Sequence, residues 1–422
     1  MLLGPRRVGK SVEVKRTIEN MITAGTDPRS IAHMSVDGFS SHDLVAFIRT
    51  AGRLMPQEGL RWWFIDEITS VSGGWPAQIK WLRDNDARFC RDTVVLTGSS
   101  SSNLRESTGE LAGRRGPASD PDRLLLPIGF RTFLRLTHHD LKLEQLESSP
   151  RLSVTDLTPS RLSEAAYHLV PWLHILADAW EDYLRVGGFP QAIANHIRHQ
   201  QPDDSLRIAL KGVISGDAFQ QSRLSELQTS EMLHRLARGL GSPYNVTHLA
   251  REIGVSPPTA RRRIDDLRES FVAWPVYRER NLRPLLRAQE KIYFTDPVYT
   301  HLSDPASEPR IGPMDETALS EQQLAVALWR NIAWQHRGSH TRFDRVLYYR
   351  SDTGAEIDFV GPDLGTLAIE SKYVDGRWRR NTGRTMAASR WWGIIATRTE
   401  LNLDNLELSA IPASMLASLI DD

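Results

Sequence analysis

Over residues 1–130, short hydrophobic runs alternate with longer stretches in which apolar and polar residues recur at helical spacing. Continuous apolar runs of this length are typical of strands that are buried on both faces of a sheet. Such strands are predicted at 31–36, 62–65 and 93–96. Helices are predicted before and between them, at 12–24, 43–54 and 76–82. Strands and helices that alternate in this way indicate an α/β domain with a parallel sheet.

The pattern changes along the rest of the chain. It becomes helical after residue 130, and helices are predicted at 132–136, 165–186 and 205–218. A compact basic segment follows, then a stretch with three prolines that predicts a linker, and the last part returns to mixed α/β character. The predicted domains are 1–130, 131–240, 241–300 and 315–422, with the linker at 301–314.

A glycine-rich loop opens the first predicted helix and fits the pattern G-x-x-x-x-G-K-[ST] at every fixed position. Its residues are Gly4, Pro5, Arg6, Arg7, Val8, Gly9, Lys10 and Ser11. The glycines allow a tight turn whose backbone N–H groups point at phosphate oxygens, and the helix directs its positive end at the same anion. Lys10 supplies charge for the β- and γ-phosphates, and the Ser11 hydroxyl is a ligand for Mg²⁺. The loop therefore predicts ATP binding, although the strand before it is limited to Met1-Leu2-Leu3.

Two acidic residues, Asp66 and Glu67, follow the apolar run 62–65. A buried strand that ends here brings Asp66 to the edge of the sheet where phosphate binds, so Asp66 is predicted to hold Mg²⁺. Glu67 is predicted to orient and deprotonate the attacking water. An ordinary acidic turn is the alternative. After the next strand, Thr97 or Ser99 is predicted to contact the γ-phosphate, and a helix N-cap in this serine-rich segment is the alternative.

One arginine further along the first domain is a candidate for the same reaction. Arg114 follows Leu111-Ala112-Gly113 and is predicted to act as an arginine finger, either in cis or toward a neighbouring subunit. The second case would require a homo-oligomer. An ordinary surface arginine is the alternative.

Composition limits the classes of partner. The chain carries 52 basic and 52 acidic residues, so contact with nucleic acid requires a local basic patch. The single cysteine, Cys90, excludes a disulfide framework and a cysteine-based zinc site. No apolar run is long enough to span a membrane, and the first residues lead directly into the glycine-rich loop, without room for a signal peptide. We therefore expect a cytoplasmic protein with no membrane partner.

A local basic patch is present at 243–291, where ten basic and six acidic residues give a net charge of +4. A helix–turn–helix with a two-stranded wing is predicted at 246–253, 257–269, 272–277 and 291–294. Its second helix carries Arg261, Arg262 and Arg263, which are predicted to contact DNA phosphates. A lid or a protein-binding surface is the alternative role of this module.

Charged side chains recur on two strands near the C-terminus that predict a hairpin, 356–360 and 367–372. Side chains alternate between the two faces of a strand. Glu356 and Asp358 therefore share one face of the first strand. In the same way, Glu370 and Lys372 share one face of the second.

Carboxylates and a lysine on adjacent strands suit Mg²⁺-assisted cleavage of a phosphodiester. In this interpretation Asp358 and Glu370 hold the metal, and Lys372 activates water or stabilises the developing charge. Glu321, on a predicted helix, is a further carboxylate for the site. A solvated strand edge with a salt bridge is the alternative.

The motifs and their order resemble the prokaryotic AAA-type ATPases that carry a C-terminal domain of unknown function with a core like that of PD-(D/E)xK restriction endonucleases. The resemblance rests on 4–11, 64–67, 96–99, 111–114, 127–133 and 183–190, on the helix–turn–helix, and on Asp358 with Glu370-Ser371-Lys372. It implies an α/β multidomain chain with a P-loop sheet, a helical lid, a winged helix and a restriction-endonuclease-like end. It also implies ATP and Mg²⁺ as cofactors.

Two functions follow from these predictions. The first is an ATP-hydrolysing protein that acts on DNA and has a nuclease-like, Mg²⁺-dependent C-terminal domain. The second is a nucleotide-dependent switch that binds DNA or a protein partner and cleaves nothing. The arrangement of the C-terminal acids separates the two, because cleavage requires that Asp358 and Glu370 reach one metal ion.

Overall fold

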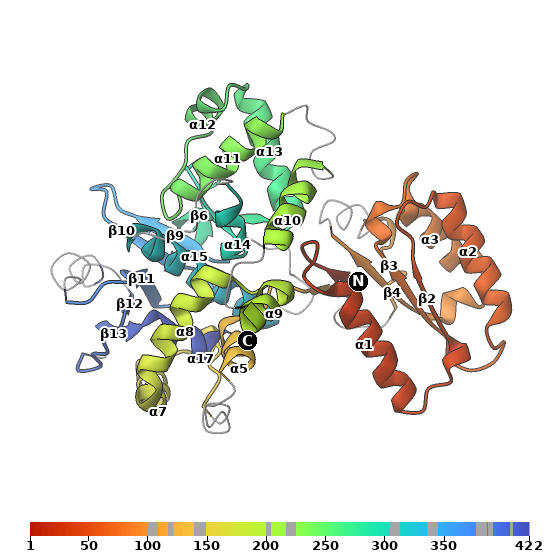
Figure 1. The fold of residues 1–422 in the computed structure, drawn as a ribbon, viewed down its shortest axis with the longest axis horizontal. Helices are drawn as coiled ribbons and strands as arrows, with labels where there is room; N and C mark the ends of the chain where they lie inside the picture. The colour runs from red at the N-terminus through yellow and green to blue at the C-terminus, as the bar shows by residue number, and fades with distance from the viewer. Residues whose placement is uncertain are drawn as a thin grey trace. The chain divides into compact units, whose positions relative to one another are not determined.

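The structure is a computed structural model of the chain, drawn in Figure 1. The residues that it describes are 1–99, 109–116, 121–138, 149–199, 204–216, 225–303, 313–335, 345–376, 386, 391–405 and 408–421. They divide into two compact units. The first is formed mainly by residues 1–126, and the second by 127–268, 272–336 and 342–422. Most of the predicted linker, 304–312, lies outside the described residues.

The first unit contains a five-stranded parallel sheet with the order β2-β3-β4-β1-β5. Its strands are β1 (Leu2–Leu3), β2 (Ile31–Ser35), β3 (Trp62–Asp66), β4 (Thr93–Gly98) and β5 (Arg123–Leu124). The three strands predicted from apolar runs are confirmed, and the two-residue β1 lies between β4 and β5. The strand that carries Asp66 is therefore separated from β1 by β4.

Three helices cover this sheet: α1 (Lys10–Thr23), α2 (Ser41–Leu54) and α3 (Trp75–Asn85). The sequence starts α2 with a capping box, because Ser40 Oγ accepts from Asp43 N while Ser40 N donates to the Asp43 carboxylate. In Figure 1, α2 and α3 lie on one side of the sheet and α1 on the other. This arrangement buries both faces of the central strands, as their uninterrupted apolar sequences predict.

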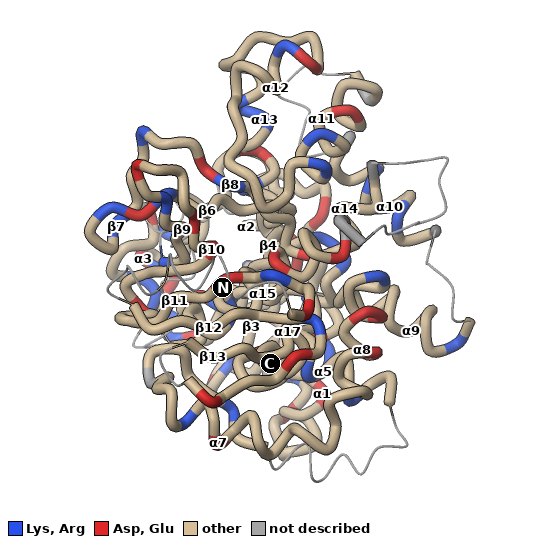
Figure 2. Tube along the Cα trace, turned by 90° about the vertical axis from the view of Figure 1, so that its left-hand side faces the viewer, with Lys and Arg blue, Asp and Glu red and all other residues tan. Residues whose placement is uncertain are grey.

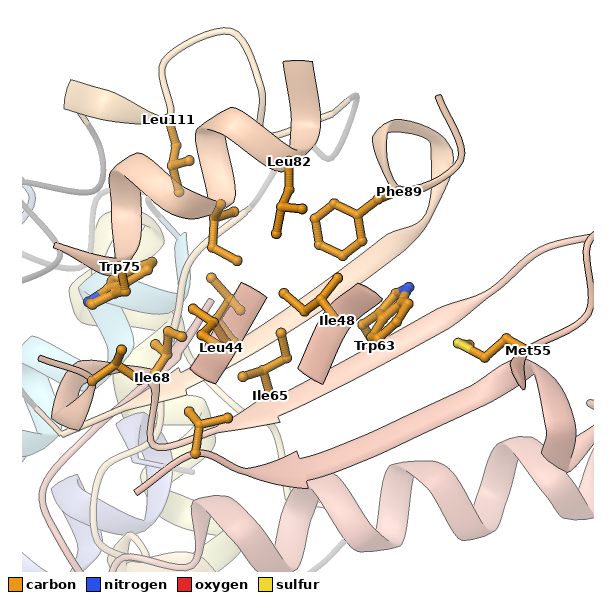
Figure 3. Close-up of a cluster of buried hydrophobic side chains, with 14 residues drawn as sticks. Leu44, Ile48, Met55, Trp63, Ile65, Ile68, Trp75, Leu82, Phe89 and Leu111 are labelled. Carbon is orange, nitrogen blue, oxygen red and sulfur yellow. The ribbon is translucent and has the colours of Figure 1, made fainter. Parts of the chain in front are cut away.

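The core of the first unit lies between the sheet and the pair α2 and α3 (Figure 3). Leu44 and Ile48 of α2 point toward Trp63 and Ile65 of β3. A buried ion pair connects the residue before β3, Arg61, to the residue before β4, Asp92. Arg61 Nη2 lies 2.6 Å from Asp92 Oδ2, and the indole Nε1 of Trp63 donates to the same oxygen at 2.8 Å.

The second unit begins with helices α5 (Phe130–Thr137), α7 (Pro159–Leu169), α8 (Leu173–Val186), α9 (Pro190–His199), α10 (Asp204–Gly216) and α11 (Glu226–Arg238). The single helix predicted at 165–186 is wrong, because a 3₁₀ turn at Val170–Trp172 divides it into α7 and α8. Pro171 explains the break, since a proline has no N–H for the helical ladder.

The strands of the second unit form one eight-stranded sheet, with the order β13-β12-β11-β10-β9-β6-β7 and β8 paired to β6. They are β6 (Ala273–Arg280), β7 (Arg283–Pro284), β8 (Lys291–Phe294), β9 (Leu347–Arg350), β10 (Glu356–Val360), β11 (Leu367–Ser371), β12 (Trp392–Thr397) and β13 (Leu408–Pro412). The predicted C-terminal hairpin is confirmed as the antiparallel pair β10 and β11. The strands predicted as a wing join the same sheet, because β6 pairs in parallel with β9.

The remaining helices of the second unit are α12 (Val246–Glu252), α13 (Pro257–Glu269), α14 (Pro297–Thr300), α15 (Pro313–Gln335) and α17 (Ala413–Ile420). Short 3₁₀ helices occur at Pro28–Ser30, Ile68–Ser70, Phe89–Arg91, Val154–Asp156, Val170–Trp172 and His301–Ser303. The helix–turn–helix elements α12 and α13 agree with their predicted ranges. Among the helices of the described residues, none has the length and apolar character that crossing a membrane requires.

The Gly187-Gly188 pair packs against the buried carboxylate of Asp296. Gly188 N donates to Asp296 Oδ2 at 2.7 Å, and Val298 N donates to Oδ1 at 2.9 Å. A Cβ at Gly187, whose φ is +79°, would lie 2.2 Å from Asp296 Oδ1. Burial raises the pKa of Asp296 to about 7, although both N–H groups favour its charged form.

Asp296→Ala is expected to lower the free energy of unfolding by about 2–4 kcal/mol, because it leaves two buried N–H groups without an acceptor. The measurement is urea denaturation of the purified protein. Asp178→Ala, at an exposed position of α8, is the matched control and is expected to shift stability by less than about 0.5 kcal/mol. Equal midpoints for the two variants would contradict the prediction.

Candidate nucleotide-binding site

The glycine-rich loop connects the end of β1 at Leu3 to the start of α1 at Lys10. Two of its positions require glycine. Gly4 has a φ of +153°, and a Cβ there would lie 2.0 Å from the carbonyl oxygen of Leu125. Gly9 has a φ of +105° and caps α1 without a side-chain hydrogen bond, so the first N–H groups of the helix have no side-chain acceptor there. This turn provides the backbone donors that an anion needs.

Lys10 is folded over this loop. Its Nζ donates to Gly4 O at 3.0 Å and to Pro5 O at 2.9 Å, and it lies 4.0 Å from Glu67 Oε1. Burial lowers the pKa of Lys10, while the nearby charges of Glu67 and Asp66 oppose that shift. The Lys10 side chain is therefore buried beside two acids, and it is available to a phosphate that replaces the two carbonyl partners.

The other loop residues differ in exposure. Pro5 and Val8 are buried, Arg6 is half-buried, and Arg7 is exposed with a φ of +64°. Ser11, in the first turn of α1, is half-buried. Ser11 directly follows the buried Lys10 along the chain, which is the order of these two residues in the P-loop motif.

Thr97, near the end of β4, contacts Asp66 at the end of β3 and Glu67, the residue that follows it. Its Oγ1 donates to Asp66 Oδ1 and accepts from Glu67 N at 2.9 Å. Ser99 Oγ donates to Glu67 Oε2 at 3.3 Å. The structure thus brings together Lys10, Asp66, Glu67, Thr97 and Ser99, which were predicted separately from three strand ends. The two polar residues contact the acids directly.

Glu67 adopts a left-handed conformation, with φ at +58° and ψ at +40°. This conformation is uncommon for residues other than glycine and is often found where a side chain serves a site. Thr69 was missed by sequence reasoning. Its Oγ1 accepts from Ser99 N at 3.2 Å, and it fills the space above Gly98, where a Cβ would lie 2.4 Å from Thr69 Cγ2. No motif in the sequence signals this role.

The site fits a nucleotide with Mg²⁺. Asp66 is buried, Thr97 fixes its Oδ1, and its Oδ2 makes no hydrogen bond to any residue in the part of the chain that the structure describes. A carboxylate oxygen and the Ser11 hydroxyl are hard oxygen ligands. Magnesium in nucleotide sites uses one or two such ligands together with phosphates and water. Asp66 and Ser11 are therefore the residues that would hold the ion.

Arg114 lies elsewhere on the first unit. Its Nε pairs with Asp84 Oδ1 of α3 at 2.6 Å, and its Nη1 donates to Ala112 O at 3.0 Å. Among the described residues, the ion pair of Arg114 is with Asp84 and not with the acids around Lys10. An arginine-finger role would require the ion pair with Asp84 to break.

The three arginines of α13 have different environments. Arg263 is fully buried, so the prediction that it contacts DNA phosphates does not fit its position. Arg261 pairs with Glu290 and donates to Tyr244 Oη at 3.1 Å, whereas Arg262 is exposed. Basic and acidic positions both occur around α12 and α13 (Figure 2). The side chain of Arg261 is 42% exposed despite these contacts, and Arg262 is exposed as well.

In the second unit, the predicted C-terminal acids converge with a lysine that sequence reasoning missed. Lys291 of β8 is fully buried, and its Nζ lies 2.8 Å from Glu356 Oε1, 2.9 Å from Asp358 Oδ1 and 3.1 Å from Glu321 Oε1. Burial alone would lower the pKa of Lys291, but the charges of Asp358 and the neighbouring acids raise it well above its usual value. Lys291 therefore stays positively charged.

Glu370 and Lys372 adjoin the same cluster. Lys372 Nζ lies 2.5 Å from Glu370 Oε1, and Asp358 N donates to Glu370 Oε2 at 3.2 Å. Burial, and then the charge of Asp358, raise the pKa of Glu370. We call Glu321, Glu356, Asp358, Glu370 and Lys291 the acidic centre. It does not fit a divalent metal as arranged, because Lys291 already pairs with three of its four carboxylates. Among the described residues, no group of three or more His, Cys, Asp or Glu is arranged to hold a metal ion.

Comparisons with known proteins agree with the geometry of the first unit. The sequence matches the family model of the AAA domain over residues 1–134, and that of a domain of unknown function, DUF8612, over residues 177–302. The first unit is thus similar to AAA domains, and its glycine-rich loop lies within the matched residues. Neither of these two matches reaches 315–422, the segment predicted as nuclease-like.

Two solved structures have a distant likeness to the chain. The Walker-type ATPase PABY2304 of Pyrococcus abyssi is 15% identical, with a TM-score of 0.37 over 72% of this chain and 89% of that chain. Cdc6p from Pyrobaculum aerophilum is 12% identical, with a TM-score of 0.26 over 75% of this chain and 86% of that chain. Both TM-scores are below 0.5, so the function of neither protein is carried over. Among curated proteins, no significant match is found.

Proposed function

We propose that the first unit binds and hydrolyses ATP with Mg²⁺. The observation that carries this proposal is that Lys10 lies beside Glu67, while Thr97 and Ser99 contact the two acids. Lys10 follows a loop that requires glycine at Gly4 and Gly9. The match of residues 1–134 to the AAA domain family supports it.

Each residue then has a role. The N–H groups of the loop and the ammonium of Lys10 bind the phosphates. Glu67 accepts a proton from the attacking water, and Ser99 and Thr97 fix its side chain and its backbone. Asp66 and Ser11 would hold a Mg²⁺ ion, which would neutralise charge on the phosphates. The left-handed backbone of Glu67 sets the direction of its carboxylate.

Lys10→Ala tests the binding step. It removes the buried ammonium and is expected to weaken binding of Mg·ATP by about 10–100-fold, the effect of losing a charge-assisted contact worth about 1.5–3 kcal/mol. Titration calorimetry measures the affinity. Lys15→Ala, at an exposed position of the same helix, should leave it unchanged. Equal affinities of Lys10→Ala and wild type would overturn the proposed site.

For the second unit we propose a helical lid at 131–240, a winged helix at 241–300 and a nuclease-like fold at 315–422. We infer that ATP turnover switches the binding of DNA by this unit. The exposed Arg262 and the net charge of +4 over 243–291 support the choice of DNA. A protein partner is the alternative occupant.

A second candidate function is Mg²⁺-dependent cleavage of DNA by Asp358, Glu370 and Lys372. The hydrogen bond from Asp358 N to Glu370 Oε2 and the ion pair of Glu370 with Lys372 favour it, because the three predicted groups adjoin. Lys291, paired with Asp358, opposes it. We therefore rank the switch first.

Incubation of the protein with plasmid and linear DNA, with Mg²⁺ or Mn²⁺ and with or without ATP, separates these two functions. The switch predicts no cleavage under any of these conditions, together with DNA binding that changes with ATP and weakens in Arg262→Ala. Cleavage by the wild type that is lost in Lys372→Ala would instead establish the nuclease.

A further inference from the structure

We propose that Lys291 is the resident cation of the acidic centre, and that the centre accepts a divalent metal ion only when the charge of Lys291 is removed. This proposal concerns the second unit alone and does not rest on ATP hydrolysis by the first. The lysine comes from β8, Glu321 comes from α15, and Glu356 and Asp358 come from β10. All of these elements belong to the second unit.

The number of N–H donors on Lys291 matches the number of carboxylates that contact it. A lysine ammonium carries three N–H protons and accepts none. Lys291 Nζ has three carboxylate oxygens within 2.8–3.1 Å, one each from Glu321, Glu356 and Asp358. Each proton therefore has an acceptor, and the ammonium is saturated without water or a further ligand.

The distances are those of an ammonium and not of a metal ion. Hydrogen bonds from a charged nitrogen to a carboxylate are about 2.7–2.9 Å long, whereas Mg²⁺ binds oxygen at about 2.0–2.1 Å. The oxygens of Glu356 and Asp358 lie 2.8 and 2.9 Å from Lys291 Nζ. A Mg²⁺ ion at that point would require each carboxylate to move inward by most of an ångström.

The surroundings hold the carboxylates in place. Tyr293 Oη donates to Glu321 Oε1, and Ser371 N donates to Asp358 Oδ2 at 2.9 Å. Gly241 lies against the opposite oxygen of Glu321, where a Cβ would be 2.7 Å from Oε2. Because these groups hold Glu321 and Asp358 in place, removing the lysine leaves their oxygens directed at one point with no cation.

Charge favours a divalent ion after that change. The acidic centre and Lys372 together have four acids and two lysines, a formal charge of −2, and Lys291→Met makes it −3. Uncompensated buried charges are strongly destabilising. A divalent cation that binds the three freed oxygens would relieve this charge, using the carboxylate ligands that hard cations prefer.

The test uses Mn²⁺ alone as the probe, with nucleotide-free full-length protein and electron paramagnetic resonance to count bound ions. Wild type and Asp358→Asn are expected to bind equal numbers of ions. Lys291→Met is expected to gain one site that is lost again in Lys291→Met combined with Asp358→Asn. In parallel, Mn²⁺ should raise the melting temperature of Lys291→Met and leave that of the wild type unchanged.

Lys211→Met, which removes a lysine of α10 outside the centre, is the matched control and should gain no site. If Lys291→Met does not fold, Lys291→Met combined with Glu356→Gln restores the formal charge of −2 and is used in its place. A Mn²⁺ site in the wild type that Asp358→Asn abolishes would overturn the proposal. So would a folded Lys291 variant that gains no Asp358-dependent ion.

Discussion

Glu67→Gln is expected to lower ATP turnover by about 10²–10⁴-fold, the usual contribution of a positioned general base. Glutamine keeps the size of the side chain and can still accept from Ser99 Oγ, which lies 3.3 Å from Glu67 Oε2, but it cannot take a proton from water. ATP affinity should remain, because the loop and Lys10 bind the phosphates. Phosphate release under saturating ATP measures turnover, and calorimetry measures affinity.

Glu58→Gln is the matched control for this variant. Glu58 is exposed, lies in the loop before β3, and carries the same charge, so its loss should leave turnover unchanged. A Glu67→Gln protein that binds ATP and turns it over at the wild-type rate would remove Glu67 from the reaction. A joint loss of binding and turnover would show instead that Glu67 holds the site together through its contact with Lys10.

Asp92→Asn is expected to destabilise the first unit by about 3–5 kcal/mol, the cost of breaking a buried ion pair by removing one partner. The Asp92 carboxylate accepts from Arg61 Nε at 3.1 and 3.0 Å, from Arg61 Nη2, and from the Trp63 indole. Asparagine can satisfy the indole but leaves the guanidinium buried without a counter-charge.

Urea denaturation measures this loss, and ATP identifies the relevant transition, because a ligand shifts the unfolding of the unit that binds it. Asp37→Asn changes an exposed aspartate of the same unit and should shift the midpoint little. A loss of less than about 1 kcal/mol in Asp92→Asn would mean that Arg61 finds water or another acceptor.

The sequence predicts the first unit well because its signals are local. Apolar runs mark the buried strands, and the loop from Gly4 to Ser11 is a continuous motif. The acidic centre could be predicted only in part, because its cation comes from a distant strand. Lys291 reaches Glu321 across 30 residues and Asp358 across 67, and no spacing rule connects such positions.

The burial of Arg263 could have been predicted from the sequence, whereas the backbone conformation of Glu67 could not. Ala260, Arg263, Ile264 and Leu267 recur at the spacing of one helix face, and all four are buried. This periodicity places Arg263 on the buried face of the helix, and so separates it from Arg261 and Arg262. The left-handed backbone of Glu67 had no such signal, and the side chain that bonds its N–H, Thr97, is 30 residues away along the chain.

The parallel pairing of β6 with β9 limits where the chain can be cut into fragments. A fragment that ends before residue 313 would leave the Tyr277–Arg278 edge of β6 without Leu347 and Tyr348, and unpaired strand edges promote association between chains. The proline-containing stretch 301–314 therefore resembles a domain boundary in the sequence, but the strands before and after it belong to one sheet. A truncation or fusion made at this stretch would therefore divide one sheet and would not release two separately folded parts.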